Sequence, residues 1–281
     1  MLDRDRTLAA ELFDESPHLR STGEVSPKFR ALSSRSKRVT VGGQALHVVE
    51  GDLLLDDDEL ILHALRSERA DLVPSQTWGD SDLVGILLKG RPVRWDRGTV
   101  LRYCVLRNSF PDRDTYRVAR ESMADAAAAW ESVCAIEFTH EVEFDEFTDL
   151  AASARDISER LVFVVRFIDA GGEFVASAFF PTQPPARRKV LIDPSFFSDD
   201  LNFDRVGIMR HELGHIMGFR HEHILAGAPA DCPEEKDQNI FSFGPYDPKS
   251  VMHYFCGGVG TLDLTLTPGD IKGAMGLYPR D

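Results

Sequence analysis

The spacing of apolar residues along this chain changes near residue 92. Beyond that point, short runs rich in β-branched and aromatic residues alternate with a long segment whose apolar residues recur every three or four positions. Such runs predict strands, and the wider spacing predicts a helix. The predicted strands are Thr99–Leu106, Ala135–Phe138, Leu161–Phe167 and Lys189–Ile192, and the predicted helix is Thr115–Val133. Residues 92–281 are therefore expected to form one domain of the α/β (α+β) class.

Three further elements are expected in the second half of the chain. The apolar run Phe174–Phe180 is followed by a proline, and a strand beside proline is more often an edge strand than a central one because proline has no N–H for pairing. Asn202 or Asp204 is placed to cap a helix that starts just after it. A last helix is predicted at Pro268–Leu277, with Thr267 as its cap and proline at its first position.

Residues 1–91 have a different character and are expected to form a separate N-terminal segment. Ser33–Arg38 is polar and basic, as in a linker. Asp56–Ser67 places acidic residues before apolar ones and predicts a helix, since acidic residues stabilise helix N-termini. Prolines, glycines and small polar residues between 73 and 91 predict an irregular connection. Irregular chain is also expected over most of residues 218–250.

Composition excludes several kinds of partner. The chain has 281 residues, and 43% of them are hydrophobic, which is enough for a substantial core. Its formal net charge of -14 disfavours nucleic acid and anionic membranes, because both are negatively charged. No apolar run reaches the roughly 18 residues of a membrane span. Met1–Arg6 is not followed by the apolar stretch of a signal peptide, so the compartment is left open. A monomer is expected.

Four cysteines are too few for a disulfide scaffold, but their number is even. A bridge between Cys232 and Cys256 would tie down the loop between them, and the alternative is that two of the four cysteines are buried thiols. Cys104 and Cys134 lie in apolar runs and are compatible both with a pair and with free core cysteines.

The candidate chemistry is concentrated in one stretch, HELGHIMGFRH, which begins at His211. Residues four apart lie on one face of a helix, so His211 and His215 present two imidazoles to the same point, with Glu212 nearby. Gly218 can leave the helix in a left-handed conformation, which allows the chain to bring His221 to that point. Three nitrogen ligands leave one position of a tetrahedral zinc ion open for water, as in a catalytic site. The stretch therefore predicts Zn2+ as the cofactor.

The other histidines lack this spacing. His223 is a rival third ligand, but its separation from His215 departs from the pattern, and a solvated position or one beside the ligands is expected. His253 is expected to point away from the metal. Four more are expected at the surface or in the core: His18, His47, His63 and His140.

The stretch from His211 to His221, the glutamate that follows it and the later Ser250–Tyr254 resemble the metzincin zinc endopeptidases, and within them the astacins. The segment Ala176–Pro181 is more similar to the edge strand with which matrixins receive peptide substrates. The resemblance implies a metzincin-like catalytic domain with a twisted mixed sheet, a zinc-binding helix and a largely irregular C-terminal part, preceded by a prosegment. It also favours a secreted or exported protein.

The resemblance assigns roles to further residues. Met252 matches the methionine turn beneath the metal, and Tyr254 matches the tyrosine that in astacins serves as an additional zinc ligand and swings towards the transition state. Gly51-Asp52 is similar to the Gly-Asp of astacin prosegments, whose aspartate caps the zinc, although this dipeptide also marks ordinary turns. Glu222 matches a glutamate that in mature astacins meets the freed N-terminus, and here that contact requires prior cleavage.

The predicted function is a zinc-dependent endopeptidase made as a latent zymogen, with Glu212 as general base and Tyr254 supporting the oxyanion. An extended polypeptide is the expected substrate, because an edge strand has free N–H and C=O groups. Arg220 either favours acidic residues near the cleavage point or faces solvent. Two alternatives stand beside this prediction: a narrow-specificity toxin or effector protease, and a zinc-binding module without catalysis, which would not need Glu212.

Overall fold

The computed structural model describes residues 36–64, apart from 58 and 62, together with 76–77, 83–147, 160–232 and 239–280. Its central element is a five-stranded sheet with the strand order β10-β11-β9-β7-β8. These strands are β7 (Val100–Val105), β8 (Glu137–His140), β9 (Phe163–Phe167), β10 (Ala176–Ser177) and β11 (Lys189–Ile192). β10 pairs antiparallel with β11, and the other neighbours are parallel, so the predicted mixed sheet is confirmed.

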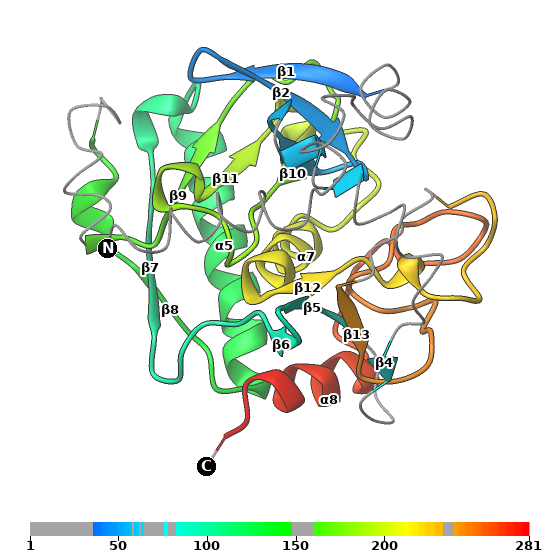
Figure 1. Cartoon of the computed structure of the whole chain (residues 1–281). Helices are drawn as coiled ribbons and strands as arrows, with labels where there is room; N and C mark the ends of the chain where they lie inside the picture. The colour runs from blue at the N-terminus through cyan, green and yellow to red at the C-terminus, as the bar shows by residue number, and fades with distance from the viewer. Residues whose placement is uncertain are drawn as a thin grey trace, which may run out of the picture.

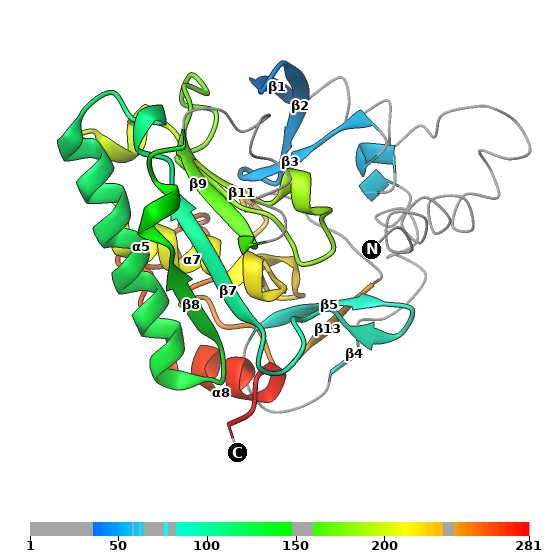
Figure 2. The same cartoon turned by 90° about the vertical axis from the view of Figure 1, so that its left-hand side faces the viewer.

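Two helices, α5 (Arg113–Val133) and α7 (Arg205–Met217), pack against each other and share the main hydrophobic core with the sheet (Figure 2). The indole N–H of Trp130 on α5 donates to the carbonyl oxygen of Arg210 on α7 at 2.9 Å, which fixes the two helices relative to each other. A third helix, α8 (Pro268–Leu277), lies below them in Figure 1. In the described part of the chain no helix combines the length and the apolarity needed to span a membrane.

Two smaller sheets flank this core. The first is an antiparallel sheet of β1 (Lys37–Val41), β2 (Gln44–Val49) and β3 (Leu53–Leu55), drawn in blue in Figure 1. Its apolar side chains, Val39 among them, pack with Leu191 of β11. The second contains β4 (Gln76–Thr77), β5 (Val84–Leu88), β12 (Phe219–Arg220) and β13 (Ile240–Ser242), with β6 (Arg91–Pro92) paired to β5. Short 3-10 helices connect the elements: η1 (Arg107–Ser109), η2 (Val142–Phe144), η3 (Pro185–Arg187), η4 (Pro194–Phe197) and η5 (Glu222–Ile224).

The predicted helix caps are confirmed where the structure describes them. The side chain of Asp204 accepts from the backbone N–H of Gly207 at the start of α7, and Thr267 forms a capping box with Asp270 at the start of α8. Helical residues also occur between 57 and 64, within the range predicted at 56–67, and residues 65–67 lie outside the described chain. Reciprocal hydrogen bonds between Asp56 and Glu59, both 2.9 Å long, start that helix.

The predictions of irregular chain at residues 37–38 and across 73–91 are wrong, whereas most of the described residues within 218–250 are irregular, as predicted. Residues 37 and 38, assigned to a linker, begin β1. β5 falls within residues 73–91, and β12 and β13 fall within 218–250. These strands are short and pair with partners more than a hundred residues away, so local composition carries little signal for them. β8 begins two residues later than predicted, and the predicted edge strand shrinks to the two residues of β10, although its place at the edge of the sheet is confirmed.

Candidate metal centre

Helix α7 presents two histidines side by side. His211 and His215 are one turn apart and both are buried, with ring centroids separated by 4.9 Å. The Nδ1–H of His211 donates to the carbonyl oxygen of Val251 at 2.7 Å, and the Nδ1–H of His215 donates to that of Phe219 at 2.8 Å. Because each Nδ1 carries the proton, each Nε2 keeps its lone pair for a metal ion, and the backbone acceptors hold both rings in place.

Gly218 ends α7 and turns the chain towards the third histidine. Its φ is 104°, in the left-handed region, and a Cβ at this position would lie 2.5 Å from the carbonyl oxygen of Val93. The chain then passes through β12 and reaches His221, whose Nε2 lies 3.1 Å from Nε2 of His215. Two nitrogens bound to one tetrahedral zinc ion lie roughly 3.3 Å apart, given Zn–N bonds of about 2.0–2.1 Å.

Replacing Gly218 with alanine is expected to lower the free energy of unfolding by roughly 1–3 kcal/mol and to weaken zinc binding, because the turn would be strained and its Cβ would clash. Thermal unfolding and metal analysis of the purified variant measure both effects. Gly98→Ala is a matched control, since Gly98 also has a positive φ, of 76°, but a Cβ there would have no atom within 4 Å. Unchanged zinc affinity in Gly218→Ala would show that the turn does not position His221.

A carboxylate completes the group of potential ligands. Oδ2 of Asp52 lies 3.3 Å from Nε2 of His211, 3.4 Å from that of His215 and 3.1 Å from that of His221. Potential ligand atoms of these four buried residues all lie within 4.8 Å of one another. Three imidazole nitrogens and one carboxylate oxygen form a donor set that suits tetrahedral zinc.

The protonation states agree with metal binding. Burial lowers the pKa of His215 to about 4, so its imidazole is neutral at neutral pH, as a ligand must be. Burial alone would raise the pKa of Asp52, but the surrounding imidazoles, above all His221 and His215, hold it well below its ordinary value. The carboxylate is therefore ionised at neutral pH. The four residues thus fit a zinc ion electrostatically as well as in position.

Glu212 is buried beside this group. Its Oε2 makes no hydrogen bond among the described residues. Burial raises the pKa of Glu212 well above its ordinary value, and the negative charge of Asp52 adds to this effect. A carboxyl group in such surroundings is suited to take up a proton and to give it back, which is the property required of a general base and acid.

Met252 packs against helix α7. A Cβ on Gly214 would lie 2.3 Å from Sδ of Met252, so glycine at that position allows the sulfur to approach the backbone of α7. Asp270 of α8 holds this turn: its carboxylate accepts from the hydroxyl of Ser250 at 2.6 Å and from the backbone N–H of Val251 at 2.9 Å. Sequence reasoning missed Asp270, although its place in the capping box of α8 gave a local signal.

Tyr254 also faces this group of residues. Its ring lies over His221, with centroids 4.4 Å apart, and its hydroxyl donates to the carbonyl oxygen of Glu50 at 2.6 Å. Gly51 has a φ of 94°, and a Cβ there would lie 2.8 Å from the Tyr254 hydroxyl oxygen. The N-terminal segment therefore reaches the site through three consecutive residues. Glu50 and Gly51 contact Tyr254, and Asp52 contacts the histidines.

Arg220 is buried, so the prediction that it faces solvent is wrong. Its Nη2 donates to both carboxylate oxygens of Glu50, at 2.7 and 2.8 Å, and both side chains are at most 5% exposed. His63 approaches the same carboxylate at 3.2 Å. Sequence reasoning missed Glu50, because no spacing rule connects it to a residue 170 positions later.

The remaining predicted residues lie around the centre without joining it. His223 is buried and stacks on His221 at 5.1 Å, so it packs beside a ligand and is not solvated. His253 lies outside the group of four. Glu222 is buried, and its carboxylate accepts from the backbone N–H of Asp247 at 3.1 Å. His47 is buried, whereas His63 and His140 are partly buried; His18 lies outside the described chain.

The cysteines behave differently from one another. Cys232 and Cys256 form the predicted bridge. Cys104 and Cys134 are separate, buried free thiols, and burial raises the pKa of each to about 12.

Several known proteins are similar to parts of this chain. The zinc metalloproteinase nas-39 of Caenorhabditis elegans is 36% identical over 77 residues, which are 22% of this chain and 8% of that protein. Human stromelysin-3 is 32% identical over 166 residues, 58% of this chain and 32% of its own length. An astacin-like metalloendopeptidase of Gallus gallus is 42% identical over 62 residues, 17% of this chain and 15% of that protein. The chain thus spans at most about a third of these relatives.

No protein-family model matches the chain. A solved structure of myroilysin aligns with 70% of this chain and with its own full length, at a TM-score of 0.45 and 15% identity. The three-histidine group, together with the similarity to both astacins and a matrixin, makes this chain similar to the metzincin zinc proteases.

Proposed function

We propose that this chain is a zinc-dependent endopeptidase that is made in a latent form and cleaves extended polypeptides. The observation that carries the proposal is the convergence of three imidazole nitrogens on one point beside a buried carboxyl group whose pKa is raised, that of Glu212. A purely structural zinc site is usually closed by four protein ligands and has no need of such a neighbour. The alternative of a zinc-binding module without catalysis gives no reason for a buried Glu212 with a raised pKa beside the metal site.

His211, His215 and His221 would hold the zinc ion, and Asp52 would occupy the remaining position in the latent form. Zinc bound by these residues would supply a Lewis acid able to lower the pKa of a water molecule to about 7. Glu212 takes the proton of the attacking water and delivers it to the leaving amine. Once the hydroxyl of Tyr254 is no longer engaged with Glu50, it is available to donate a hydrogen bond to the carbonyl oxygen of the scissile bond.

The edge strand β10 is the proposed site of substrate binding. β10 ends the sheet, so one side of its backbone is open to pairing with a peptide. In the latent form the N-terminal segment lies here, since Leu53–Leu55 and Ser177–Phe180 line the same pocket. Substrate and N-terminal segment would therefore compete for this edge.

Latency rests on three sets of contacts made by the N-terminal segment. Asp52 faces the histidines, Glu50 binds Arg220, and Arg187 of η3 binds both Asp56 at 2.5 Å and Glu59 at 2.7 Å. The first contact blocks the position needed for water, and the other two hold the segment in place. We propose that residues 1–91 contain this inhibitory part and that activation removes it.

Metal analysis combined with a peptide-library digest tests the proposed function. About one zinc per chain is expected, together with cleavage that a chelator abolishes and added zinc restores. Cleavage that survives complete zinc removal would contradict the proposal. The digest also shows whether the activated protein cuts broadly or, as in a toxin or effector, at one narrow class of sequence.

Glu50→Gln is expected to loosen the N-terminal segment, because breaking a buried ion pair leaves the partner charge uncompensated at a cost of about 3–5 kcal/mol. Hydrogen exchange should accelerate in β1–β3 and stay unchanged in α5. Asp57→Asn is the control, since that carboxylate is 72% exposed, its partners Arg38 and His47 belong to the same N-terminal segment, and asparagine can still hydrogen-bond to His47. Equal exchange in the two variants would contradict the anchoring role of Glu50.

A further inference from the structure

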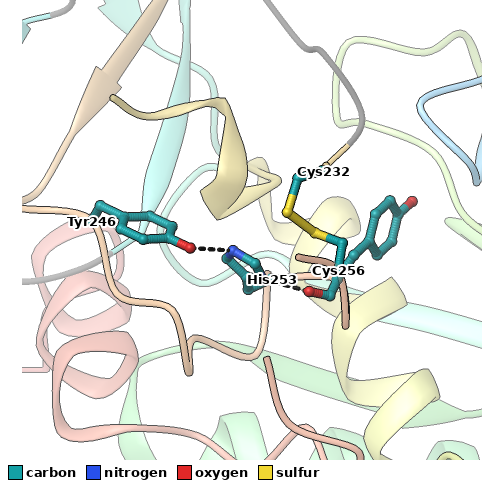
Figure 3. The surroundings of a disulfide bond; sticks show 5 residues. Cys232, Tyr246, His253 and Cys256 are labelled. Atoms are coloured by element: carbon teal, nitrogen blue, oxygen red, sulfur yellow. Dashed lines mark hydrogen bonds between the residues drawn. A yellow bond between two sulfur atoms is a disulfide. The ribbon is translucent and has the colours of Figure 1, made fainter. Parts of the chain in front are cut away.

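The disulfide between Cys232 and Cys256 has a histidine beside it. A ring nitrogen of His253 and both sulfur atoms all lie within 4.8 Å of one another. In Figure 3 the imidazole lies between Tyr246 and Cys256. Its Nε2 is 2.6 Å from the hydroxyl oxygen of Tyr246, and its Nδ1 is 2.5 Å from the carbonyl oxygen of Tyr254. The three residues form a Cys2His group that shares no member with the group around Asp52.

We propose that reduction of this bridge creates a second metal site, in which Cys232, Cys256 and His253 bind a zinc ion. The reductant is a dithiol: its two thiols become a disulfide, and the bridge gains two protons and two electrons to give two cysteine thiols. Zinc then displaces one proton from each thiol and binds both sulfurs and one imidazole nitrogen. In the oxidised chain a covalent bond ties Cys232 to Cys256, just after the methionine turn. In the reduced chain a metal ion bound by the two cysteines and His253 would tie the same segments together.

The geometry suits this exchange. In a tetrahedral zinc site with Zn–S bonds of about 2.3 Å, two sulfurs lie roughly 3.8 Å apart, and a sulfur and a nitrogen lie roughly 3.6 Å apart. The imidazole nitrogen already lies within 4.8 Å of both sulfurs, and the two sulfurs, which are now bonded to each other, have to move apart on reduction to reach these separations. Two thiolates and one imidazole form a ligand set that binds zinc in preference to calcium or magnesium. Cys232 is buried and Cys256 is half-buried, so Cys256 is the more exposed residue of the pair.

Zinc binding by His253 requires one of its ring nitrogens to give up its present oxygen partner. Each of its ring nitrogens faces an oxygen atom, of Tyr246 on one side and of Tyr254 on the other. When one nitrogen binds the metal, the other retains its oxygen partner, which fixes the orientation of the ring and raises the basicity of the ligand.

The other two thiols do not compete for the metal. Cys104 belongs to a small cluster between β7 and β9, whereas Cys134 lies in the main core, so the two are in different parts of the core. Neither joins a metal-binding group among the residues that the structure describes. A signal that requires thiolate ligands therefore reports on Cys232 and Cys256.

Cobalt(II) titration of the full chain tests the proposal without any substitution. The oxidised chain should take up one equivalent and show no thiolate-to-cobalt charge-transfer band in the near ultraviolet, since its histidine centre has no sulfur. After reduction with a dithiol, which is removed before cobalt is added, the chain should take up a second equivalent and show that band. The band requires sulfur, so it can be measured even if the histidine centre binds no metal. Failure of the proposed protease function can therefore be told apart from failure of the proposed second metal site.

Two variants assign the ligands in the reduced chain. Cys232→Ser should abolish the band, and His253→Ala should weaken the second site at least tenfold while the bridge still forms under oxidising conditions. Circular dichroism before cobalt is added establishes that each sample is folded. The proposal would be overturned if the reduced wild type bound one equivalent of cobalt without the band. It would also be overturned if the band persisted in Cys232→Ser, or if the chain unfolded on reduction.

Discussion

Glu212→Gln is expected to reduce peptide hydrolysis by the activated protein by about 10²–10⁴-fold, because general acid–base catalysis by one side chain contributes that much. Glutamine has nearly the shape of glutamate but cannot accept and return the proton. Zinc content should stay at the wild-type level, since the three imidazoles are unchanged. Initial rates on a quenched peptide, measured beside metal analysis of the same sample, separate these two effects.

Glu121→Gln is the matched control for this prediction. Glu121 lies on α5, is half exposed and, in the described part of the chain, pairs with two arginines of the same helix. Its loss should change neither rate nor zinc content measurably, as is usual for exposed ion pairs. Turnover by Glu212→Gln at the rate of the control would remove Glu212 from the mechanism and favour a zinc-binding role without this base.

Asp52→Ala should raise the activity of the full-length, uncleaved chain by roughly ten- to a hundredfold. A contact to a charged group is worth about 1.5–3 kcal/mol, and losing the contact of the Asp52 carboxylate shifts the segment towards release by that amount. It also vacates the position that water needs. The measurement is the initial rate of chain that has been checked by mass spectrometry to be intact.

Asp57→Ala serves as control here, because Asp57 belongs to the same segment but pairs with His47 and Arg38, away from the histidine centre. It should leave latency unchanged. If Asp52→Ala is as inactive as the control, while both proteins become active after removal of the segment, Asp52 does not cause the latency. The Glu50–Arg220 pair and the contacts of Arg187 would then have to keep the chain latent by themselves.

The sequence was most informative where structure is local. His211, His215 and Gly218 follow from the repeat of a helix and the way a helix ends, and the structure brings His221 to the same point through that turn. The helix caps at Asp204 and Thr267 are equally local, and both were predicted. Periodicity and capping depend on neighbours within a few residues, so one sequence is sufficient to predict them.

Contacts between distant segments were not predictable in this way. The Glu50–Arg220 pair joins residues far apart in sequence, and a lone arginine gives no indication of whether it is buried. β5 was missed because its apolar run is short and flanked by residues typical of turns. Gly85 within it looked like part of an irregular connection, whereas the structure shows the ring of Phe241 where a Cβ would lie, 2.4 Å away.

If activation removes the N-terminal segment as proposed, the pairing of β5 with β12 limits where that cleavage can fall. β12 leads directly into His221, and β5 supports it through the pairs of Phe219 with Gly85 and Arg220 with Val84. A protease that trimmed the N-terminus past Val84 would take this support away and leave the third ligand without its scaffold. The processing site should therefore lie upstream of Leu83, and N-terminal sequencing of active enzyme is expected to find β5 still attached.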